Sequence, residues 1–567
     1  MKTLYGHVEG LKADQRRRLE DLYARREAPE TVVSQELCWE LAGLSFEIRR
    51  QIGLLVERSG KVHSVVVGEP QKIMLPEFRD YRVIPGRLLG LKYIHTHLNH
   101  DEILTRDDLT DLALLRFDIM AAITLADDGS PYRIHVAHVN PAEGGDPCVV
   151  LPPVSPENLS ISSDVLIRET ESAVSKIEAL LDADKGEERA ILVSVTTSPR
   201  EIAMDSLAEL TELAKTSNIS VVDTIFQHRH KPDPRFLMGS GKLSDLAILA
   251  MQKSATLLVF DQELNASQIR SITDQVSIKV IDRTQMILDI FARRAKSREG
   301  KLQVELAQLK YLLPRLVTMN MAMSRLTGGI GGRGPGETKL ELNRRRANDR
   351  ITVLQKELEK VKKQRGLQKS KRKKRGLPVV SIVGYTNAGK STLLNTLTHS
   401  DVIAEDKLFA TLDPSSRRLR FPADFEVIIT DTVGFIRDLP KELMVAFEAT
   451  LEELENADIL LHVIDVSNPR FVEQIESVEK ILADLKLDLI PRINVLNKMD
   501  LVEPEVYMKW ISRFDGVAVS ARTRSSLMPL LKMLEAWVEP LVLPLNEAEA
   551  EDQFGNENGN TPLGDES

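Results

Sequence analysis

The sequence predicts a multidomain α/β protein, and three observations support that fold class. The chain has 567 residues, which is too long for one hydrophobic core and predicts roughly three or four domains. Strand-like segments alternate with amphipathic helical segments over residues 190–295 and again over 377–540, which is typical of parallel α/β units. The first 150 residues mix the two patterns irregularly, so we expect an α+β unit there.

The stretch 378–391, PVVSIVGYTNAGKS, combines a short apolar strand with a G-x-x-x-x-G-K-S loop. Gly384 and Gly389 allow backbone N–H groups to turn toward phosphates, Lys390 reaches the terminal phosphates, and the Ser391 hydroxyl ligates Mg²⁺. The helix expected next directs the positive end of its dipole at the same anion. We therefore expect this loop to bind a nucleoside triphosphate with Mg²⁺.

Further motifs follow in the order and spacing that a guanine-nucleotide site requires. Asp500, in N-K-x-D after an apolar stretch, offers two acceptor oxygens to adjacent N–H donors, which guanine has and adenine lacks. Asp431, in D-T-V-G at a strand end, supplies a carboxylate to Mg²⁺ through water, and Thr411 is the expected second hydroxyl on that ion. Ser520 and Ala521 are expected beside the base.

We expect a doubly wound sheet over 377–540, with the nucleotide at the carboxyl ends of its strands. The residues expected to bind GTP or GDP are Gly384, Tyr385, Thr386, Asn387, Ala388, Gly389, Lys390, Ser391, Thr392, Phe409, Ala410, Thr411, Leu412, Asp413, Asp431, Thr432, Val433, Gly434, Asn497, Lys498, Met499, Asp500, Ser520, Ala521 and Arg522.

Two positions concern catalysis. Phe435 follows Asp431-x-x-Gly434, where Ras-like proteins place a glutamine that positions water. A phenyl ring cannot bond to water, so we expect slow intrinsic hydrolysis that is completed by ribosomal RNA, another residue or a cation. Asn387 matches a position that resembles a K⁺ ligand in potassium-activated GTPases, and the alternative is a loop asparagine that bonds to its own backbone.

Residues 95–108 form the pattern H-x-H-x(7)-T-x-x-D, with His95, His97, Thr105 and Asp108 at the fixed positions. This pattern resembles the zinc motif of JAMM/MPN-type isopeptidases, in which serine usually stands at the Thr105 position. The resemblance implies an MPN-like α+β domain over 1–150. It also implies Zn²⁺ on His95, His97 and Asp108, with water in the fourth position.

Such enzymes also need a general-base glutamate just before the strand that corresponds to residues 52–57. Gln51 stands there, and an amide cannot accept a proton, so the hydrolase would be inactive unless Glu47 substitutes. The sequence therefore favours a binding or structural module over a working metallohydrolase, and we do not expect Zn²⁺ in residues 1–150.

The composition constrains location and partners. The net charge of −9 implies no overall attraction to nucleic acid, although the charge is unevenly distributed. Cys38 and Cys148 cannot build a disulfide framework and suit a reducing compartment. The chain shows no signal peptide and no apolar run near the ~18 residues of a membrane span. We expect a cytoplasmic monomer.

The predicted domain boundaries are 1–150, 151–188, 189–295, 296–376, 377–540 and 541–567. The second segment, rich in Pro and Ser, is expected to be a linker with a helix, and the last an acidic, disordered tail. Within 189–295, a G-S-G-K sequence at 239–242 could hold an anion, but a tight turn that caps a helix is the favoured interpretation.

Residues 296–376 predict two long helical segments that pair as an antiparallel hairpin. The connecting loop has six glycines between 328 and 336, and residues 361–376 carry nine Lys or Arg and no acid. Arg325 and Arg333, beside and within this loop, are the expected RNA contacts, with a partnerless loop as the alternative.

The RGPGE sequence at 333–337, the preceding α/β unit and the motifs GYTNAGKSTL, FATLDP, DTVGF and NKMD together resemble the HflX family of translational GTPases over about 190–540. The resemblance implies Mg²⁺-dependent GTP hydrolysis, binding to the large ribosomal subunit and its RNA, and splitting of stalled or idle ribosomes under stress. Two alternatives stay open: a GTP-gated module that binds the large subunit without splitting, and a metalloisopeptidase in residues 1–150 under GTPase control.

Overall fold

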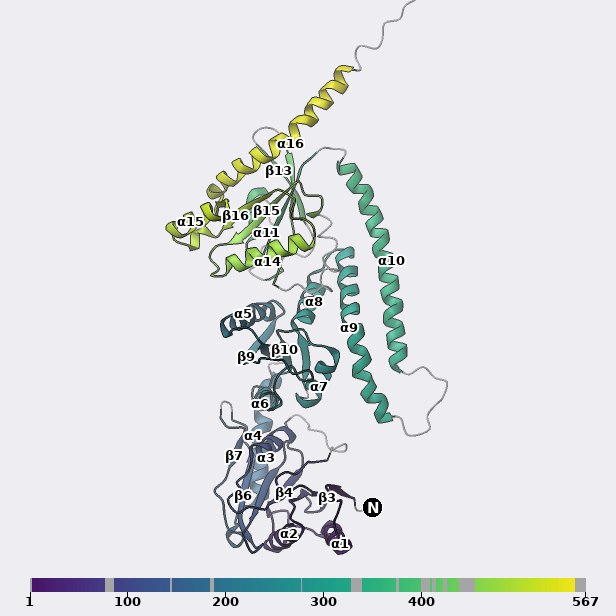
Figure 1. Cartoon of the computed structure of the whole chain (residues 1–567), viewed down its shortest axis with the longest axis vertical. Helices are drawn as coiled ribbons and strands as arrows, with labels where there is room; N and C mark the ends of the chain where they lie inside the picture. Colours follow the sequence, from purple (N-terminus) through teal and green to yellow (C-terminus); the bar gives the residue numbers. More distant parts are fainter. Residues whose placement is uncertain are drawn as a thin grey trace, which may run out of the picture.

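The computed structural model describes residues 3–76, 86–142, 145–183, 188–276, 278–327, 339–373, 377–398, 408–409, 415–421, 426–437 and 454–555. Three units, each built on one sheet, follow one another along the longest axis of the molecule (Figure 1). We name them the N-terminal unit (3–183), the middle unit (188–294) and the C-terminal unit (377–555). A hairpin of two long helices (298–373) connects the last two.

The N-terminal unit contains a seven-stranded mixed sheet with strand order β1-β3-β2-β4-β5-β6-β7. The strands are β1 (Leu4–Gly6), β2 (Ile52–Glu57), β3 (Val62–Val67), β4 (Leu91–His97), β5 (Ile119–Leu125), β6 (Pro131–Val139) and β7 (Cys148–Val150). The helices are α1 (Ala13–Asp21), η1 (Leu22–Ala24), α2 (Gln35–Ile48), α3 (Arg106–Leu115), η2 (Pro156–Asn158) and α4 (Ser163–Ala183). Strands β4 and β5 are buried along their whole length, as strands covered on both faces must be.

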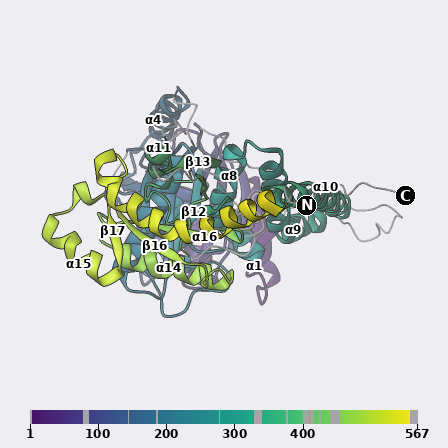
Figure 2. The same cartoon turned by 90° about the horizontal axis from the view of Figure 1, so that it is seen from above.

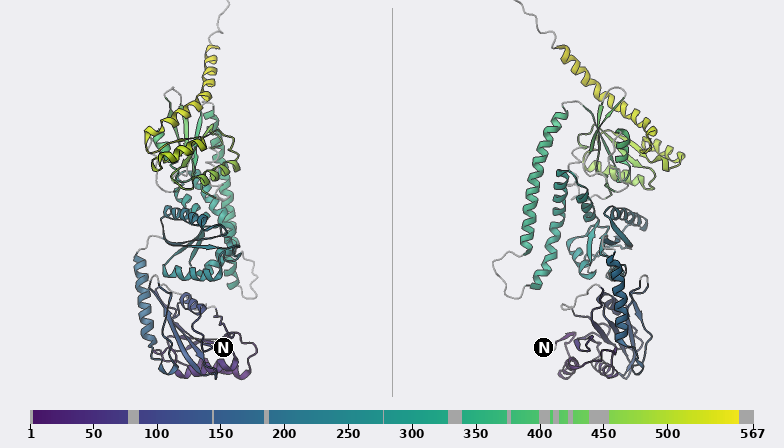
Figure 3. Two further views of the ribbon diagram at one scale, coloured as in Figure 1. Left: turned by 60° about the vertical axis from the view of Figure 1, so that its left-hand side comes forward. Right: turned by 180° about the vertical axis from the view of Figure 1, so that it is seen from behind.

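The expected linker over 151–188 differs from what the structure shows. Val154 forms a bridge with Ile134, and α4 places Ile167 and Val174 among buried side chains, Ile167 within the core of the N-terminal unit. The left view of Figure 3 shows α4 lying along that unit. The segment is thus part of the N-terminal unit, because its helix is amphipathic and finds an apolar surface to cover.

The middle unit is an all-parallel sheet with strand order β11-β10-β8-β9 and helices between its strands. Its elements are β8 (Glu188–Thr196), α5 (Arg200–Thr216), β9 (Ile219–His228), α6 (Ser240–Gln252), β10 (Leu257–Phe260), α7 (Ala266–Val276), β11 (Lys279–Asp282) and α8 (Arg283–Arg294). Gly239 is the N-cap of α6, which agrees with the interpretation of 239–242 as a turn that caps a helix.

The hairpin consists of α9 (Arg298–Thr327) and α10 (Lys339–Lys373), which lie side by side in Figure 1 and in the right view of Figure 3. Their apolar side chains form one shared cluster, in which Leu302 and Leu306 of α9 meet Leu354 and Leu358 of α10. This pairing is what the helical spacing of the leucines predicts. The base of α9 also packs on α8 and the sheet of the middle unit through Val304, Ala307 and Tyr311.

The C-terminal unit contains a six-stranded sheet with strand order β13-β14-β12-β15-β16-β17, in which only β13 is antiparallel. The strands are β12 (Val379–Gly384), β13 (Ser415–Arg420), β14 (Glu426–Asp431), β15 (Ile459–Asp465), β16 (Arg492–Asn497) and β17 (Gly516–Ala518). The helices are α11 (Lys390–Thr398), α14 (Phe471–Asp484), η3 (Met499–Leu501), α15 (Pro504–Phe514), η4 (Arg524–Leu527) and α16 (Met528–Gly555). The predicted doubly wound sheet is present.

The expected disordered tail from 541 needs a correction. Helix α16, which crosses the C-terminal unit when seen from above (Figure 2), continues to Gly555. Alanine and glutamate dominate residues 547–552, and both favour helix, so the helix extends past the last core contact. Residues 556–567 lie outside the described residues. Among the helices described, none combines the length and apolar character that crossing a bilayer requires.

Candidate nucleotide site

The phosphate loop connects β12 to α11 at the point where strand order reverses, because β12 lies between β14 on one side and β15 on the other. Gly389 has a φ of +94°, and a Cβ there would lie 2.3 Å from Asn497 Nδ2. Only glycine satisfies both constraints. The loop therefore has the backbone that the G-x-x-x-x-G-K-S pattern predicts, and Thr392 continues it into the first turn of α11.

Lys390 lies fully inside the loop. Its ammonium group donates to the backbone oxygens of Tyr385 at 2.7 Å and Gly384 at 3.2 Å. Burial lowers the pKa of Lys390 to about 8, against an opposing effect of the Asp431 carboxylate. A phosphate group in the loop would replace the two carbonyl oxygens as partner and favour the charged ammonium.

Two of the three residues expected at the Mg²⁺ site, Ser391 and Asp431, adjoin each other, whereas Thr411 lies outside the described residues. The Ser391 hydroxyl donates to Asp431 Oδ2 at 2.7 Å, and Asp431 is buried at the end of β14. A hydroxyl and a carboxylate are hard oxygen donors of the kind that Mg²⁺ prefers, so the pair fits this ion. When bound, Mg²⁺ would neutralise charge on the phosphates beside Lys390. Thr432 also helps to fix this corner, since its hydroxyl donates to Ile382 O at 2.6 Å.

The Asn497 side chain joins the phosphate loop to the loop that carries Ser520 and Ala521. Its amide donates to Ala388 O at 2.8 Å, and its side-chain oxygen accepts from Ala521 N at 2.8 Å. The side chain is 1% exposed, so both bonds are shielded from water. Met499 N donates to Val519 O at 3.2 Å, which brings η3 beside the strand end that carries Ser520. Sequence motifs more than a hundred residues apart thus meet around one space.

The residues that follow Asn497 include those expected beside the base. Lys498 has a φ of +62°, and its ammonium pairs with Asp465 Oδ2 at 2.7 Å. Asp500 and Arg522 are exposed, while Ser520 is buried. Asp465, at the end of β15, is a site residue that no predicted motif included.

Phe435 is 4% exposed and packs with Val383 and Tyr385. Its backbone pairs with the phosphate loop, since Thr386 N donates to Phe435 O at 2.8 Å and Phe435 N donates to Gly384 O at 3.1 Å. The ring is thus a packing group, and its lack of a role in positioning water remains a prediction. A glycine is also required at position 434, where this segment lies against the phosphate loop, because a Cβ there would lie 2.8 Å from Lys390 Nζ.

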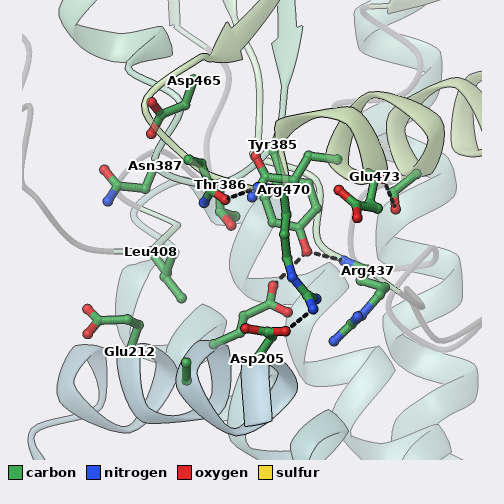
Figure 4. A pocket seen from close by; sticks show the side chains of 15 residues that line it. Asp205, Glu212, Tyr385, Thr386, Asn387, Leu408, Arg437, Asp465, Arg470 and Glu473 are labelled. Atoms are coloured by element: carbon green, nitrogen blue, oxygen red, sulfur yellow. Dashed lines mark hydrogen bonds and ion pairs between the residues drawn. The ribbon is translucent and has the colours of Figure 1, made fainter. Parts of the chain in front are cut away.

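Asn387 is exposed, with a φ of +62°. It lines a cavity of about 330 Å³ between the phosphate loop and the middle unit (Figure 4). Thr386 and Leu408 line the same cavity, and the Arg470–Asp205 ion pair closes one side of it. The proposed role of Asn387 as a K⁺ ligand remains a prediction.

The phosphate loop also contacts the middle unit directly. The Tyr385 hydroxyl donates to Glu209 Oε1 on α5 at 2.8 Å and accepts from Arg437 N at 2.8 Å (Figure 4). Glu209 is paired in turn with Arg283 of α8 at 2.8 Å. No sequence motif indicated Glu209 or Asp205 as part of the site, because each comes from another unit.

Several predicted site residues lie outside the described residues: Ala410, Thr411, Leu412, Asp413 and Arg333. Phe409 is described and is 2% exposed. Arg325 lies in α9, but its side chain is not described.

The His95, His97 and Asp108 side chains, far from the nucleotide site, do come together in the N-terminal unit. Gln51 lines the adjacent cavity, whereas Glu47 is bonded to Gln15 and Arg18. Cys38 and Cys148 are buried free cysteines, and burial raises the pKa of each thiol to about 12.

Three ranges of the chain match models of known protein families. Residues 204–292 match the GTP-binding GTPase N-terminal family, 294–372 match the GTP-binding GTPase middle region, and 379–498 match a family described as 50S ribosome-binding GTPase. The last range contains the phosphate loop, Asp431 and Asn497. The first two ranges cover most of the middle unit and the hairpin.

Curated relatives are similar over the same part of the chain. GTPase HflX of Caldanaerobacter subterraneus subsp. tengcongensis is 50% identical over 351 residues, which is 62% of this chain and 81% of the relative. GTPase HflX of Escherichia coli K12 is 42% identical over 354 residues, 62% of this chain and 83% of the relative.

A solved structure also aligns. A GTP-binding protein from the archaeon Sulfolobus solfataricus, in complex with GDP, is 23% identical and covers 63% of this chain and 99% of its own. Its TM-score of 0.34 is a value at which the likeness supports no inference. The curated relatives, the matched families and the geometry around Lys390 agree: this chain is a GTPase of the HflX family.

Proposed function

We propose that this GTPase acts in the cytoplasm on the large ribosomal subunit and its RNA, and that it separates stalled or idle ribosomes under stress. The description of the family matched by residues 379–498, which names 50S ribosome binding, supports the partner. The membership of the chain in the HflX family supports the dependence of this action on GTP.

One observation carries the proposal: the segments that flank the γ-phosphate position share a hydrophobic core with the middle unit. Leu408 and Phe409 precede Thr411, and Val433 and Ile436 follow Asp431. All four side chains are buried in the cluster formed by α5, α8 and the base of α9. The Phe409 ring packs edge-on against Phe291 of α8, with ring centroids 4.8 Å apart.

This packing gives a physical route from nucleotide to hairpin. In GTPases the γ-phosphate and Mg²⁺ hold two loops that are released on hydrolysis. Here a shift of Phe409 or Ile436 must alter the core that also holds Val304 and Tyr311 of α9. Packed interiors respond to such shifts by changing between discrete arrangements. The position of the hairpin therefore depends on the bound nucleotide.

The hairpin offers a surface for RNA. Arg344 and Arg346 are exposed on α10, on the side of the glycine-rich loop, and the sequence over 361–376 is strongly basic. Each phosphate that these cations neutralise releases counterions and adds salt-dependent affinity. No motif predicted a role for these residues, although the three consecutive arginines at 344–346 were the available signal.

The catalytic cycle follows from these parts. GTP binding orders both flanking segments and fixes the hairpin for docking on ribosomal RNA. Ser391, and Asp431 through water, would hold the Mg²⁺ that accompanies the phosphates. Binding contacts separate the subunits, and hydrolysis resets the protein. Because Phe435 is a packing group, the ribosome supplies the missing group that orients water.

Light scattering of intact ribosomes tests the proposal. We expect scattering to fall with protein plus a non-hydrolysable GTP analogue and to stay constant with GDP or with Lys390→Ala. The double variant Arg344→Glu/Arg346→Glu should lose the effect. Lys356→Glu/Lys360→Glu, the same charge change farther from the loop on α10, is the matched control and should keep it. Unchanged scattering with protein bound to the ribosomes would support a GTP-gated module that does not split them.

A further inference from the structure

One buried hydroxyl of the phosphate loop has no hydrogen-bond partner among the described residues. It belongs to Thr386, the third residue of the loop that starts at Gly384. The residue is 6% exposed, so water does not reach its Oγ1 from the surface. Burying a hydroxyl without a partner is costly, and such a group in a folded protein calls for an explanation.

The Thr386 side chain lies where three parts of the site meet. A Cβ built at Gly434 would lie 2.8 Å from Thr386 Cα, from Thr386 Cγ2 and from Lys390 Nζ. Gly434 closes the D-x-x-G segment, which is one of the two segments that respond to the γ-phosphate in GTPases. Lys390 is the residue that reaches the terminal phosphates. Thr386 therefore lies at the side of the loop where the γ-phosphate would bind.

The other polar side chains of this corner have partners. The Thr432 hydroxyl donates to a strand carbonyl at 2.6 Å, and the Lys390 ammonium donates to two carbonyls of the loop. The Ser391 hydroxyl donates to a carboxylate at 2.7 Å. The Thr386 hydroxyl differs from these groups, because the described part of the chain offers it no acceptor.

The packing of Thr386 does not explain why the residue carries a hydroxyl. Valine has the same shape and would fill the same space beside Gly434 without burying an unpaired polar atom. The backbone of the residue is held independently of its side chain, since Thr386 N donates to Phe435 O at 2.8 Å. The hydroxyl therefore points to a ligand that completes it.

A phosphate oxygen is the acceptor that fits this place. The loop motif binds phosphates through backbone N–H groups, its lysine and its serine, and it assigns no side-chain role to position 386. A hydroxyl there adds one donor, and a hydrogen bond to an ionised phosphate oxygen is stronger than one between neutral groups. GDP lacks the γ-phosphate, so the hydroxyl would stay unpaired when GDP is bound.

We propose that the Thr386 hydroxyl donates a hydrogen bond to a γ-phosphate oxygen and thereby sets the preference of this GTPase for GTP over GDP. The contact is one of binding, and the orientation of water still depends on another group. Because Thr386 N is bonded to Phe435 O, a γ-phosphate that holds Thr386 also holds the segment after Gly434. That segment carries Ile436, which is buried in the core shared with the middle unit.

Nucleotide titration of the full-length protein tests the contact, with GDP and with the β,γ-imido analogue of GTP. Thr386→Val should weaken binding of the analogue about tenfold, because it loses a hydrogen bond to a charged group, and leave GDP affinity unchanged. Thr386→Ser keeps the hydroxyl and should keep the preference. The matched control is Thr398→Val, the same change at the far end of α11, which should alter neither affinity. Equal weakening of both nucleotides, or no weakening, would overturn the proposal.

Two further measurements separate this role from a structural one. Without nucleotide, Thr386→Val should be at least as stable to heat as the wild type, because it removes a buried unpaired hydroxyl. A lower stability would show that the hydroxyl has a partner in the protein and would contradict the proposal. In the ³¹P spectrum of the bound analogue, Thr386→Val should shift the γ resonance more than the α resonance. An unmoved γ resonance would also overturn the contact.

Discussion

The Tyr385 hydroxyl of the phosphate loop donates a hydrogen bond of 2.8 Å to the Glu209 carboxylate of the middle unit. The same hydroxyl accepts from Arg437 N, in the segment that follows Asp431. One side chain of the phosphate loop thus contacts both α5 and the segment that follows Asp431. Burial and the neighbouring carboxylate raise its pKa, so it stays a donor over the physiological range.

Tyr385→Phe should weaken the contact between the C-terminal and middle units and leave GTP binding intact. The phenyl ring keeps the packing, but Arg437 N and Glu209 each lose a partner, which costs about 1–3 kcal/mol. Thermal unfolding of the full-length protein measures the loss. Tyr132→Phe, at an exposed tyrosine, is the control and should be neutral. Equal stability of the Tyr385 variant and wild type would refute the role of this contact.

Asn497→Asp should abolish GTP binding and destabilise the C-terminal unit. A carboxylate would place an oxygen against Ala388 O in a buried site, where an unsatisfied polar group costs about 1–3 kcal/mol and a charge more. Nucleotide titration and urea unfolding measure both effects. Asn494→Asp, three residues earlier on the same strand, likewise loses a bond, to Phe514 O. That control should lose stability but still bind GTP. Loss of binding in both variants would contradict a specific role of Asn497 in the nucleotide site.

GTP affinity should fall as pH rises above about 8. Burial holds the pKa of Lys390 at about 8 without nucleotide, and phosphate groups raise it. Above that pH, binding must add a proton to a neutral amine, which weakens affinity by up to about tenfold per pH unit. The dissociation constant measured from pH 7 to 9 checks this. Lys390→Gln should bind weakly without this pH dependence, and a flat wild-type profile would show that Lys390 keeps its proton.

Acid should destabilise the C-terminal unit partly through His462. Burial lowers the pKa of this histidine from 6.5 to about 3. Between these values the unfolded chain binds a proton that the folded chain excludes. The free energy of unfolding therefore falls as pH drops below about 6.5, by up to about 1.4 kcal/mol per pH unit, until about pH 3.

Urea unfolding of wild type and His462→Gln at pH 7 and pH 4.5 isolates this contribution from the other titrating groups. The loss of stability between the two pH values should be smaller in the variant. Equal losses in both proteins would show that His462 is protonated in the folded state.

The nucleotide site could be predicted from sequence because its chemistry is local. The phosphate loop is a run of consecutive residues. Its glycines indicate where the backbone must adopt a conformation that other residues rarely adopt. The Tyr385–Glu209 contact joins residues 176 positions apart, and neither residue belongs to a local pattern that indicates a partner. Helix α4 was predicted, but the surface it covers was not, since an amphipathic pattern does not identify what it faces.

The cluster of His95, His97 and Asp108 in the N-terminal unit could be predicted from sequence only in part. Spacing alone predicts that His95 and His97 share one face of a strand, because side chains alternate. The position of Asp108 depends on the parallel pairing of β4 with β5 and on the connection through α3, which periodicity does not determine. Whether this unit is MPN-like stays a prediction.

GTP turnover by the full-length protein, with and without large ribosomal subunits, decides whether this GTPase acts on the large subunit. We expect slow turnover alone, because Phe435 orients no water, and strong stimulation by the subunits. Stimulation should disappear in Lys390→Ala and weaken in Arg344→Glu/Arg346→Glu, but persist in Lys356→Glu/Lys360→Glu. Turnover that is fast alone and unaffected by large subunits would show that the ribosome does not activate this GTPase.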